Sequence, residues 1–442
     1  MISKNMSAAQ IIVFNPIIKE TAELKELYYY TIKKYISMGK WKSKYVRSEM
    51  NLYAQRLLSD TTAERRVSAS FIMQNLGSLE EYKINLVADI CAILGYEKRW
   101  VNSYKFLDVY KVIIKELGFS AEEIRQANKL IEYLISKKSC RKAADSDIDL
   151  LDKDVFGRLT ENIDFIKRKP FSFLVTATMS AGKSTFINAL TGKQINLSQN
   201  LACTSKIHSI INKPFEDGYS YEYDFDLELN ADKATLYDDN EKNMTNTIWV
   251  STCFDSKALY GKRIIIHDSP GVNSSENEEH RLITEKMLSD GKYNAVLYVI
   301  NATQLGTEDE TRHLKYIKEH LKKPILFILN KIDAFNDEDE DIVQTIDNCR
   351  KYLENEGFDK PLICPVSSYA GLLAKRSLSG EPLSRYENRT LDNFFIDFEQ
   401  NDLSQYYEAQ YEIHIEEPTN ETAQLIKRCG LGYTEELIRK FI

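Results

Sequence analysis

The stretch FSFLVTATMSAGKS, residues 171–184, decides the fold class of this 442-residue chain. Residues 171–176 predict a short apolar strand, and residues 184–190 predict a helix. Between them, residues 177–184 match the phosphate-binding loop pattern GxxxxGK[ST], except that Ala177 replaces the usual first glycine. A chance turn of small residues is the alternative for these letters alone. Because the loop requires a strand before it and a helix directly after it, the context favours a phosphate site.

The residue types in this loop suit a nucleoside triphosphate. Gly182 allows backbone N–H groups to curl around a phosphate, and the helix N-terminus adds its partial positive charge. Lys183 is expected to contact the β and γ phosphates and to act in catalysis, while the Ser184 hydroxyl completes a Mg²⁺ shell. The residues expected to bind the nucleotide here are Ala177, Thr178, Met179, Ser180, Ala181, Gly182, Lys183, Ser184 and Thr185.

A second motif indicates which base is bound. The predicted strand 324–329 ends in Asn330-Lys331-Ile-Asp333, the pattern NKxD. The Asp333 carboxylate can accept hydrogen bonds from N1–H and the 2-amino group of guanine, whereas adenine offers neither donor arrangement. Asn330 can reach the other purine edge, and the Lys331 stem can lie across the ring. This tetrapeptide alone could be a helix N-cap, but after a strand and downstream of a phosphate loop it indicates guanine.

A third motif lies between the first two. The predicted strand 263–267 is followed by Asp268-Ser-Pro-Gly271, in which Asp268 would hold Mg²⁺ through water and the Gly271 amide would sense the γ phosphate. An ordinary turn is the alternative for these four letters. Ser367 and Ser368 follow the predicted strand 362–366 and fit a final guanine-contacting loop. Together the ordered motifs predict a site for GTP or GDP with Mg²⁺.

The pattern of apolar residues changes near residue 167. Before it, apolar residues recur at helical spacing in 17–38, 42–58, 63–76, 80–94, 100–117, 121–136 and 145–166, which predicts an all-α bundle or coiled coil over residues 1–166. After it, the strands 171–176, 207–212, 263–267, 295–300, 324–329 and 362–366 alternate with helices at 184–190, 278–288, 307–321 and 339–356. This alternation predicts an α/β P-loop GTPase domain over 167–442, with a mostly parallel sheet and helices on both faces.

Composition excludes several classes of protein. A net charge of -8 argues against nucleic acid as the main partner. No apolar run approaches the ~18 residues needed to span a bilayer, and no secretory signal is recognisable at the start. The seven cysteines are scattered, which suits a reducing cytosol and argues against a disulfide scaffold or a thiolate zinc site. A cytoplasmic location is expected, with peripheral contact at the inner face of a membrane as an option.

The residues around these motifs resemble the dynamin superfamily, and its bacterial members in particular. Residues 179–190 are similar to its phosphate loop and first helix, 201–207 to the first switch, 268–284 to the second switch, and 429–438 to the last helix of the GTPase domain. The resemblance implies that Thr204 binds Mg²⁺ and senses the γ phosphate. It also implies that Ser180 helps to hold a monovalent cation, K⁺ or Na⁺, and that homodimers form across the nucleotide face.

Two features depart from the family pattern. Met179 stands where well-studied members carry a glutamine that positions the attacking water, and Val272 stands where Ras-like proteins have theirs. A site without such a residue is slow alone, so a dimer or a partner is expected to stimulate hydrolysis. His280 could reach the site in a closed dimer, but a solvated residue at a helix start is the favoured interpretation. The usual long stalk does not follow the GTPase domain, so either the bundle 1–166 is the stalk or partner-binding domain, or a separate protein supplies it.

Some alternatives stay open from the sequence alone. The leading interpretation is a GTP-hydrolysing enzyme, and the second is a GTP-binding scaffold with slow turnover that holds a partner protein through its helical half. The basic aromatic segment 24–47 could lie on an anionic membrane, although packing of its aromatics into the bundle is favoured. The acidic aromatic segment 384–417, within an insertion expected near 376–428, could dock the helical half or a partner.

Overall fold

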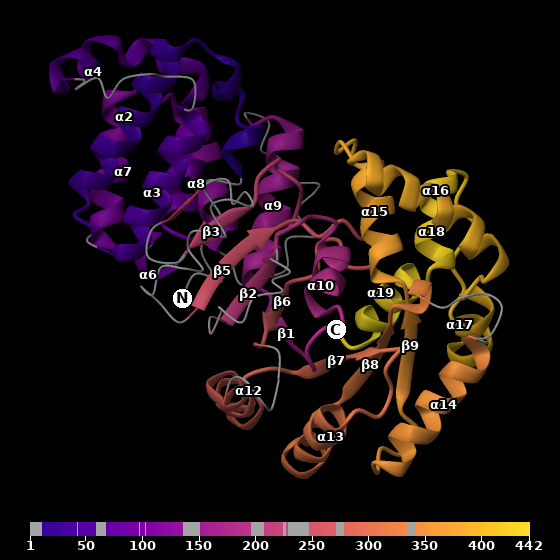
Figure 1. Cartoon of the computed structure of the whole chain (residues 1–442). Coiled ribbons are helices and arrows are strands. Elements are labelled where there is room, and N and C mark those ends of the chain that lie inside the picture. The colour runs from indigo at the N-terminus through magenta and orange to yellow at the C-terminus, as the bar shows by residue number, and fades with distance from the viewer. Residues whose placement is uncertain are drawn as a thin grey trace. The chain divides into compact units, whose positions relative to one another are not determined.

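The computed structural model describes residues 11–41, 43–58, 68–96, 98–101, 103–135, 151–195, 207–223, 227–228, 247–270, 278–334 and 342–442. The chain divides into two compact units, Met1–Lys169 and Pro170–Ile442. In Figure 1 the first unit runs from indigo to magenta and the second from magenta to yellow. Each unit has its own hydrophobic core.

The described part of the first unit is helical. Its elements are η2 (Ile12–Phe14), η3 (Pro16–Lys19), α2 (Ala22–Met38), α3 (Lys44–Leu57), α4 (Ala69–Asn75), η4 (Leu76–Tyr82), α5 (Lys83–Ile93), α6 (Lys98–Val101), α7 (Tyr104–Glu116), α8 (Ala121–Ile135) and α9 (Lys153–Lys167). Three expected helices are divided in two. Thr21 starts α2 because its side chain accepts a hydrogen bond from Leu24 N, and Ser103 starts α7 by accepting one from Phe106 N. Residues 63–67 and 145–150 of the expected helices lie outside the described residues.

The aromatic side chains of the basic segment 24–47 contribute to the core of the first unit. Tyr28 and Tyr35 are fully buried, so the favoured interpretation of that segment is confirmed for them. Asp89 of α5 is a buried carboxylate in the same unit. Its Oδ2 accepts hydrogen bonds from the Tyr53 hydroxyl at 2.6 Å, Asn15 Nδ2 at 2.7 Å and the Tyr28 hydroxyl at 2.8 Å. Burial raises the pKa of Asp89 to about 6, although the three donors oppose this shift.

A nine-stranded sheet forms the centre of the second unit, in the order β4-β3-β5-β2-β6-β1-β7-β8-β9. The strands are β1 (Phe171–Ala177), β2 (Ile207–Asn212), β3 (Tyr221–Tyr223), β4 (Leu227–Glu228), β5 (Thr247–Thr252), β6 (Ile264–Asp268), β7 (Ala295–Asn301), β8 (Ile325–Asn330) and β9 (Leu362–Val366). All neighbours from β6 to β9 pair in parallel. β2 pairs antiparallel with β6, and β3 pairs antiparallel with both β4 and β5. The sheet is therefore mostly parallel, as expected, but β3, β4 and β5 were not expected.

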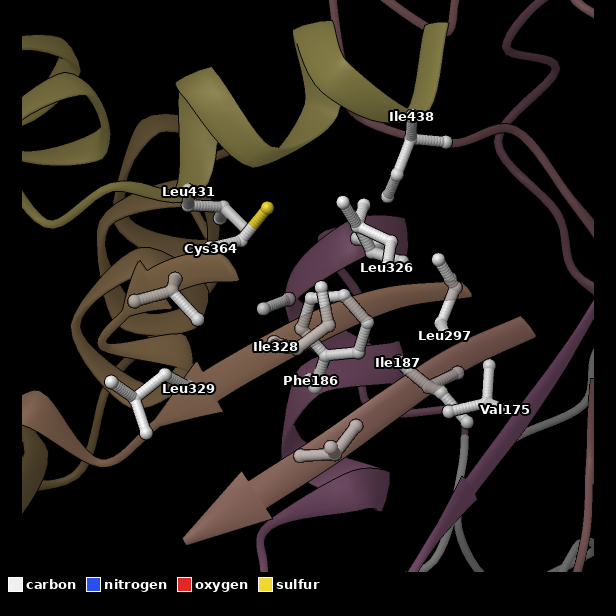
Figure 2. Packing of buried hydrophobic residues seen from close by; sticks show 14 of the residues in the cluster. Val175, Phe186, Ile187, Leu297, Leu326, Ile328, Leu329, Cys364, Leu431 and Ile438 are labelled. Carbon is white, nitrogen blue, oxygen red and sulfur yellow. The ribbon is translucent and has the colours of Figure 1, made fainter. Parts of the chain in front are cut away.

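Helices cover both faces of this sheet. α10 (Lys183–Thr191), α15 (Ser368–Leu378) and α19 (Leu431–Lys440) lie on one face, and α12 (Glu278–Asp290), α13 (Glu308–His320) and α14 (Ile342–Asn355) lie on the other (Figure 1). Figure 2 shows the first of these layers, where Ile187 of α10 lies beside Val175 of β1 and Phe186 lies beside Ile328 of β8. In the same layer, Ile438 of α19 lies beside Leu326 of β8. The expected α/β architecture is confirmed.

The acidic aromatic segment folds into the second unit. α15, α16 (Arg385–Gln400), α17 (Ser404–Tyr411) and α18 (Glu421–Arg428) occupy most of residues 376–428. Phe394, Phe398 and Tyr407 belong to the core of this unit. Tyr411 of α17 also completes the edge strand β9, because its hydroxyl donates to Ile363 O at 2.7 Å and accepts from Ile363 N at 2.8 Å. These aromatic side chains therefore serve the fold of the second unit itself.

Candidate nucleotide-binding site

The phosphate loop connects the end of β1 to the start of α10. Ala177 is the last residue of β1, fully buried and in register with Val299 of β7. Ser180 and Gly182 both have positive φ, at 62° and 83°. Backbone in this conformation turns successive N–H groups toward one concavity, which is a binding site for anions. The loop sits at the carboxyl edge of the parallel strands, where ligands of such sheets bind.

Within this loop, exposure differs from residue to residue. Met179 is 49% exposed and Ser180 is exposed, whereas Ala181 is buried. Thr178, Ser184 and Thr185 are partly buried. Gly182 cannot be replaced without a clash, because a Cβ atom there would lie 2.3 Å from Asn330 Nδ2. The glycine is therefore required by a close approach of the NKxD motif as well as by its own backbone.

The first and third motifs meet through an ion pair. The Lys183 ammonium binds the Asp268 carboxylate, and the two side chains are 12% and 9% exposed. β1 and β6 are adjacent parallel strands, with Val175 opposite Asp268, so the sheet itself brings the two motifs together. The site thus places the Lys183 ammonium, which suits a phosphate, beside the Asp268 carboxylate, which suits a divalent cation.

Asn330 connects the second motif to the phosphate loop. Its Nδ2 donates to Ala181 O at 3.0 Å, and its Oδ1 accepts from Ser368 N at 3.1 Å. The side chain is 2% exposed, so it is a fixed part of the site. Lys331 follows in a left-handed conformation with φ 68°. The structure thereby brings together the phosphate loop, the NKxD motif and the Ser367–Ser368 loop.

Asp333 lies beside the Ser367–Ser368 loop. Burial raises the pKa of Asp333, while a hydrogen bond from the Ser367 side chain and the charge of Lys331 oppose this shift. Ser367 also caps α15, since its Oγ accepts from Ala370 N at 3.1 Å. The carboxylate is therefore held at the end of β8 next to a second loop, an arrangement that can read a base edge.

The loop of Ser367 and Ser368, called the base loop below, is supported by a turn that lies far away in the sequence. The sequence did not indicate this contact. Cys429 O accepts a hydrogen bond from Ser367 N at 3.0 Å, in the turn between α18 and α19. Gly430 has φ 81°, and a Cβ atom there would lie 2.3 Å from Pro365 O. The stretch 429–438 was expected to be one helix, but α19 begins at Leu431. Gly430 was the available signal, since glycine marks left-handed helix ends.

Several expected site residues cannot be placed. Thr204, Gly271 and Val272 lie outside the described residues, and so does the side chain of His280. The oxygen groups that are described, the Asp268 carboxylate and the Ser184 hydroxyl, are hard donors of the kind that Mg²⁺ prefers. The donor chemistry therefore fits magnesium. In the part of the chain that the structure describes, no group of three His, Cys, Asp or Glu side chains forms a separate metal site.

Comparison with known proteins supports this interpretation of the motifs. Residues 174–332 match the model of the dynamin family. The chain is 30% identical over 220 residues to a probable transmembrane GTPase, FZO-like and chloroplastic, of Arabidopsis thaliana, covering 49% of this chain and 21% of that protein. It is 27% identical over 179 residues to a bacterial dynamin-like protein of Nostoc punctiforme, covering 37% and 25%. The expected resemblance to the dynamin superfamily is confirmed.

One further relative and one solved structure are also similar to this chain. An uncharacterized protein of Caldicellulosiruptor sp. is 28% identical over 246 residues, 53% of this chain and 57% of that protein. The chain thus covers less than two thirds of each of these relatives. A solved structure of an oligomerised bacterial dynamin pair aligns with 89% of this chain and 62% of its own, at 15% identity and a TM-score of 0.38. Among the described residues, no helix is both long and apolar enough to cross a membrane.

Proposed function

We propose that this chain is a dynamin-like GTPase that binds GTP with Mg²⁺ and hydrolyses it to GDP and phosphate. The observation that carries the proposal is the position of Asn330, which is hydrogen-bonded to the phosphate loop on one side and to the base loop on the other. A single ligand that spans both loops must have phosphates at one end and a base at the other. The Asp333 carboxylate selects guanine as that base.

The residues of the site divide the work of hydrolysis by position. The loop from Ala177 to Thr185 binds the phosphates, and Lys183 neutralises charge on the β and γ groups. Ser184 and Asp268 would hold Mg²⁺, together with Thr204 in the first switch, and the Gly271 amide would sense the γ phosphate. Magnesium would supply neutralisation of the negative charge on the phosphates.

Lys183 must exchange one partner for another when nucleotide binds. Its present partner, Asp268, is also the carboxylate assigned to magnesium. With nucleotide bound, Lys183 would pair with a phosphate and Asp268 would help to hold the metal, so both charges would remain paired. The phosphates and Mg²⁺ are therefore expected to bind cooperatively.

Turnover is proposed to depend on dimerisation or on a partner. Met179 occupies the loop position of the water-orienting glutamine, and its thioether cannot orient water. Ser180 is exposed in a left-handed conformation beside the phosphate cradle, where its hydroxyl can help to hold K⁺ or Na⁺. A homodimer across the nucleotide face would enclose this cation against the phosphates and so supply the missing charge stabilisation.

The second candidate is a GTP-binding scaffold with slow turnover that holds a partner through its helical unit. The same Met179 favours it, because an isolated site without a water-orienting group is expected to be slow. A cytoplasmic location with peripheral contact at a membrane is compatible with both candidates. The relatives include a bacterial dynamin-like protein and a probable transmembrane GTPase.

Calorimetry on the full chain with Mg²⁺ tests nucleotide choice. We expect GTP and GDP to bind at least about 100-fold more tightly than ATP, because a site built to hydrogen-bond one base rejects an analogue that leaves its polar groups unpaired. Equal affinity for ATP would overturn the proposal. Steady-state phosphate release then separates the candidates. An enzyme activated by dimerisation shows specific activity that rises with protein concentration and with KCl, whereas a scaffold shows slow release that changes with neither.

A further inference from the structure

The helix that begins at the phosphate loop, α10, is held at its other end by a buried charge. The last four carbonyls of any helix have no partner within the helix. In α10, two of them, the carbonyls of Ala189 and Leu190, accept hydrogen bonds from Lys375 Nζ, at 2.8 and 3.3 Å. Lys375 belongs to α15 and is 2% exposed. Its ammonium is thus fixed at the negative end of the phosphate-binding helix.

A carboxylate from the last helix completes this contact. Glu435 of α19 accepts from Lys375 Nζ at 2.5 Å through one oxygen and from Ser256 Oγ at 2.7 Å through the other. The side chains of the pair are 3% and 6% exposed. Replacing such a buried pair by apolar side chains of similar volume is often neutral for stability or improves it. Stability alone therefore does not account for two charges at this place.

The two helices that provide this pair also carry the base loop. α15 begins directly after Ser367, and the turn before α19 accepts Ser367 N through Cys429 O at 3.0 Å. Near these ends the helices pack closely, since a Cβ atom on Gly371 would lie 2.4 Å from a methyl carbon of Leu431. Both helices therefore run from the base loop to the carboxyl end of α10. A continuous path joins one end of the nucleotide site to the other.

We infer that Lys375 and Glu435 are positioning residues that set the distance between the phosphate loop and the base loop. The inference rests on the proposed function, because it concerns a ligand that contacts both loops at once. Once one end of such a ligand is bound, the other end binds as an intramolecular step, and its gain depends on correct spacing. Loosening the pair weakens binding of the whole nucleotide while leaving binding of a phosphate fragment unchanged.

The double variant Lys375→Met/Glu435→Leu of the full chain tests this inference. It removes both charges together, so no unpaired charge stays buried, but it deletes the hydrogen bonds to α10. We expect its Kd for Mg²⁺–GTP to rise about tenfold or more, the effect of losing a charge-assisted hydrogen bond. The Kd for pyrophosphate and the melting temperature should stay close to those of the unaltered protein.

A matched control is Lys427→Met, which breaks a different Lys–Glu pair, that of Lys427 with Glu417 at 2.5 Å, away from α10. It should leave the GTP affinity unchanged. An unchanged GTP affinity in the double variant would overturn the inference, as would a pyrophosphate affinity that falls by the same factor. If the double variant does not fold, Glu435→Gln replaces it, with a smaller rise in Kd for GTP expected and no rise as the contradicting result. If the unaltered protein shows no preference for GTP over ATP, the proposed function fails instead.

Discussion

Asn330 Nδ2 donates to the carbonyl oxygen of Ala181, a residue 149 positions earlier in the chain, at 3.0 Å. The same side chain accepts from Ser368 N, so one amide holds the phosphate loop and the base loop together. Asn330 therefore has a structural task in addition to the base contact proposed for it. This double task makes the residue an informative place for mutation.

Asn330→Asp separates the two bonds. The aspartate can still accept from Ser368 N, but it cannot donate to Ala181 O and places a negative charge beside that carbonyl. We expect GTP affinity to fall at least about tenfold and the free energy of unfolding to fall by about 2 kcal/mol, because a buried carbonyl loses its partner. Calorimetry and urea unfolding measure the two effects. Wild-type GTP affinity in this variant would contradict the bridging role.

Gly182→Ala is expected to abolish or severely weaken nucleotide binding. Its φ of 83° strains any side chain, and the added Cβ would lie 2.3 Å from Asn330 Nδ2. Gly218→Ala is the matched control, because φ there is 82° but nothing lies within 4 Å of the added Cβ. Both variants should lose about 1 kcal/mol of stability through backbone strain, and only Gly182→Ala should lose GTP. Equal GTP affinity in the two variants would show that the close approach is unimportant.

Asp333→Asn should change the preferred base. In the proposed site the carboxylate accepts two hydrogen bonds from guanine. An amide offers one donor and one acceptor instead, which matches the 2-oxo and N1–H groups of xanthine. We expect the Kd for GTP to rise by at least about 100-fold and xanthosine triphosphate to become the better ligand. Competition with a fluorescent GDP analogue would measure both affinities. Retained preference for GTP would place base recognition elsewhere.

Asp89 predicts a pH dependence of stability in the helical unit. Burial raises its pKa from 3.8 to about 6, so the folded state binds the proton more tightly than the unfolded state. The resulting stabilisation is full below pH 3.8 and is lost as the pH rises through 6. The loss amounts to about 3 kcal/mol.

Asp89→Asn provides the comparison for this effect. The variant retains an oxygen that can accept from Tyr28 and Tyr53 but does not titrate. Relative to this variant, the unaltered protein should lose stability between pH 4 and 7. Urea unfolding followed by tryptophan fluorescence measures the difference, since Trp41 and Trp100 belong to the helical unit. Parallel curves for the two proteins would contradict the shifted pKa.

Tyr411→Phe tests how the edge of the sheet is completed. The variant loses the two hydrogen bonds to the Ile363 backbone, so we expect about 1–2 kcal/mol of destabilisation. An unpaired edge strand is also a template for pairing with another chain, so aggregation on warming should increase. Tyr386→Phe is the control, because Tyr386 is 72% exposed. Light scattering and thermal unfolding should distinguish the two variants, and identical behaviour would show that the edge does not need Tyr411.

Local patterns predicted most of the fold. The strands that carry the motifs are short apolar runs that end at glycine, proline or polar residues, and their limits agree with the structure to within a residue or two. β5 was missed although Ile248 and Val250 alternate with other residues, because the polar residues before it gave no strand signal. Two of the divided helices were missed because a single cap, Thr21 or Ser103, interrupts an otherwise continuous apolar period.

The remaining features depend on contacts that no local pattern encodes. The phosphate, magnesium and base motifs are each one short continuous stretch of sequence, so the sequence alone indicates them. The contact between Ser367 and Cys429, and that between Lys375 and the end of α10, join segments far apart in the chain. A lysine in an amphipathic helix is usually solvated, so nothing in its neighbours predicts the burial of Lys375.

The contact of Ser367 N with Cys429 O has a consequence for biosynthesis. Residues 171–184 leave the ribosome before residues 429–435, so the Ser367–Ser368 loop has no support from Cys429 while the phosphate loop is already made. A nascent chain therefore carries its phosphate loop without a finished pocket until these residues have been added. A product truncated before residue 429 is therefore expected to fold its phosphate loop but not to retain nucleotide.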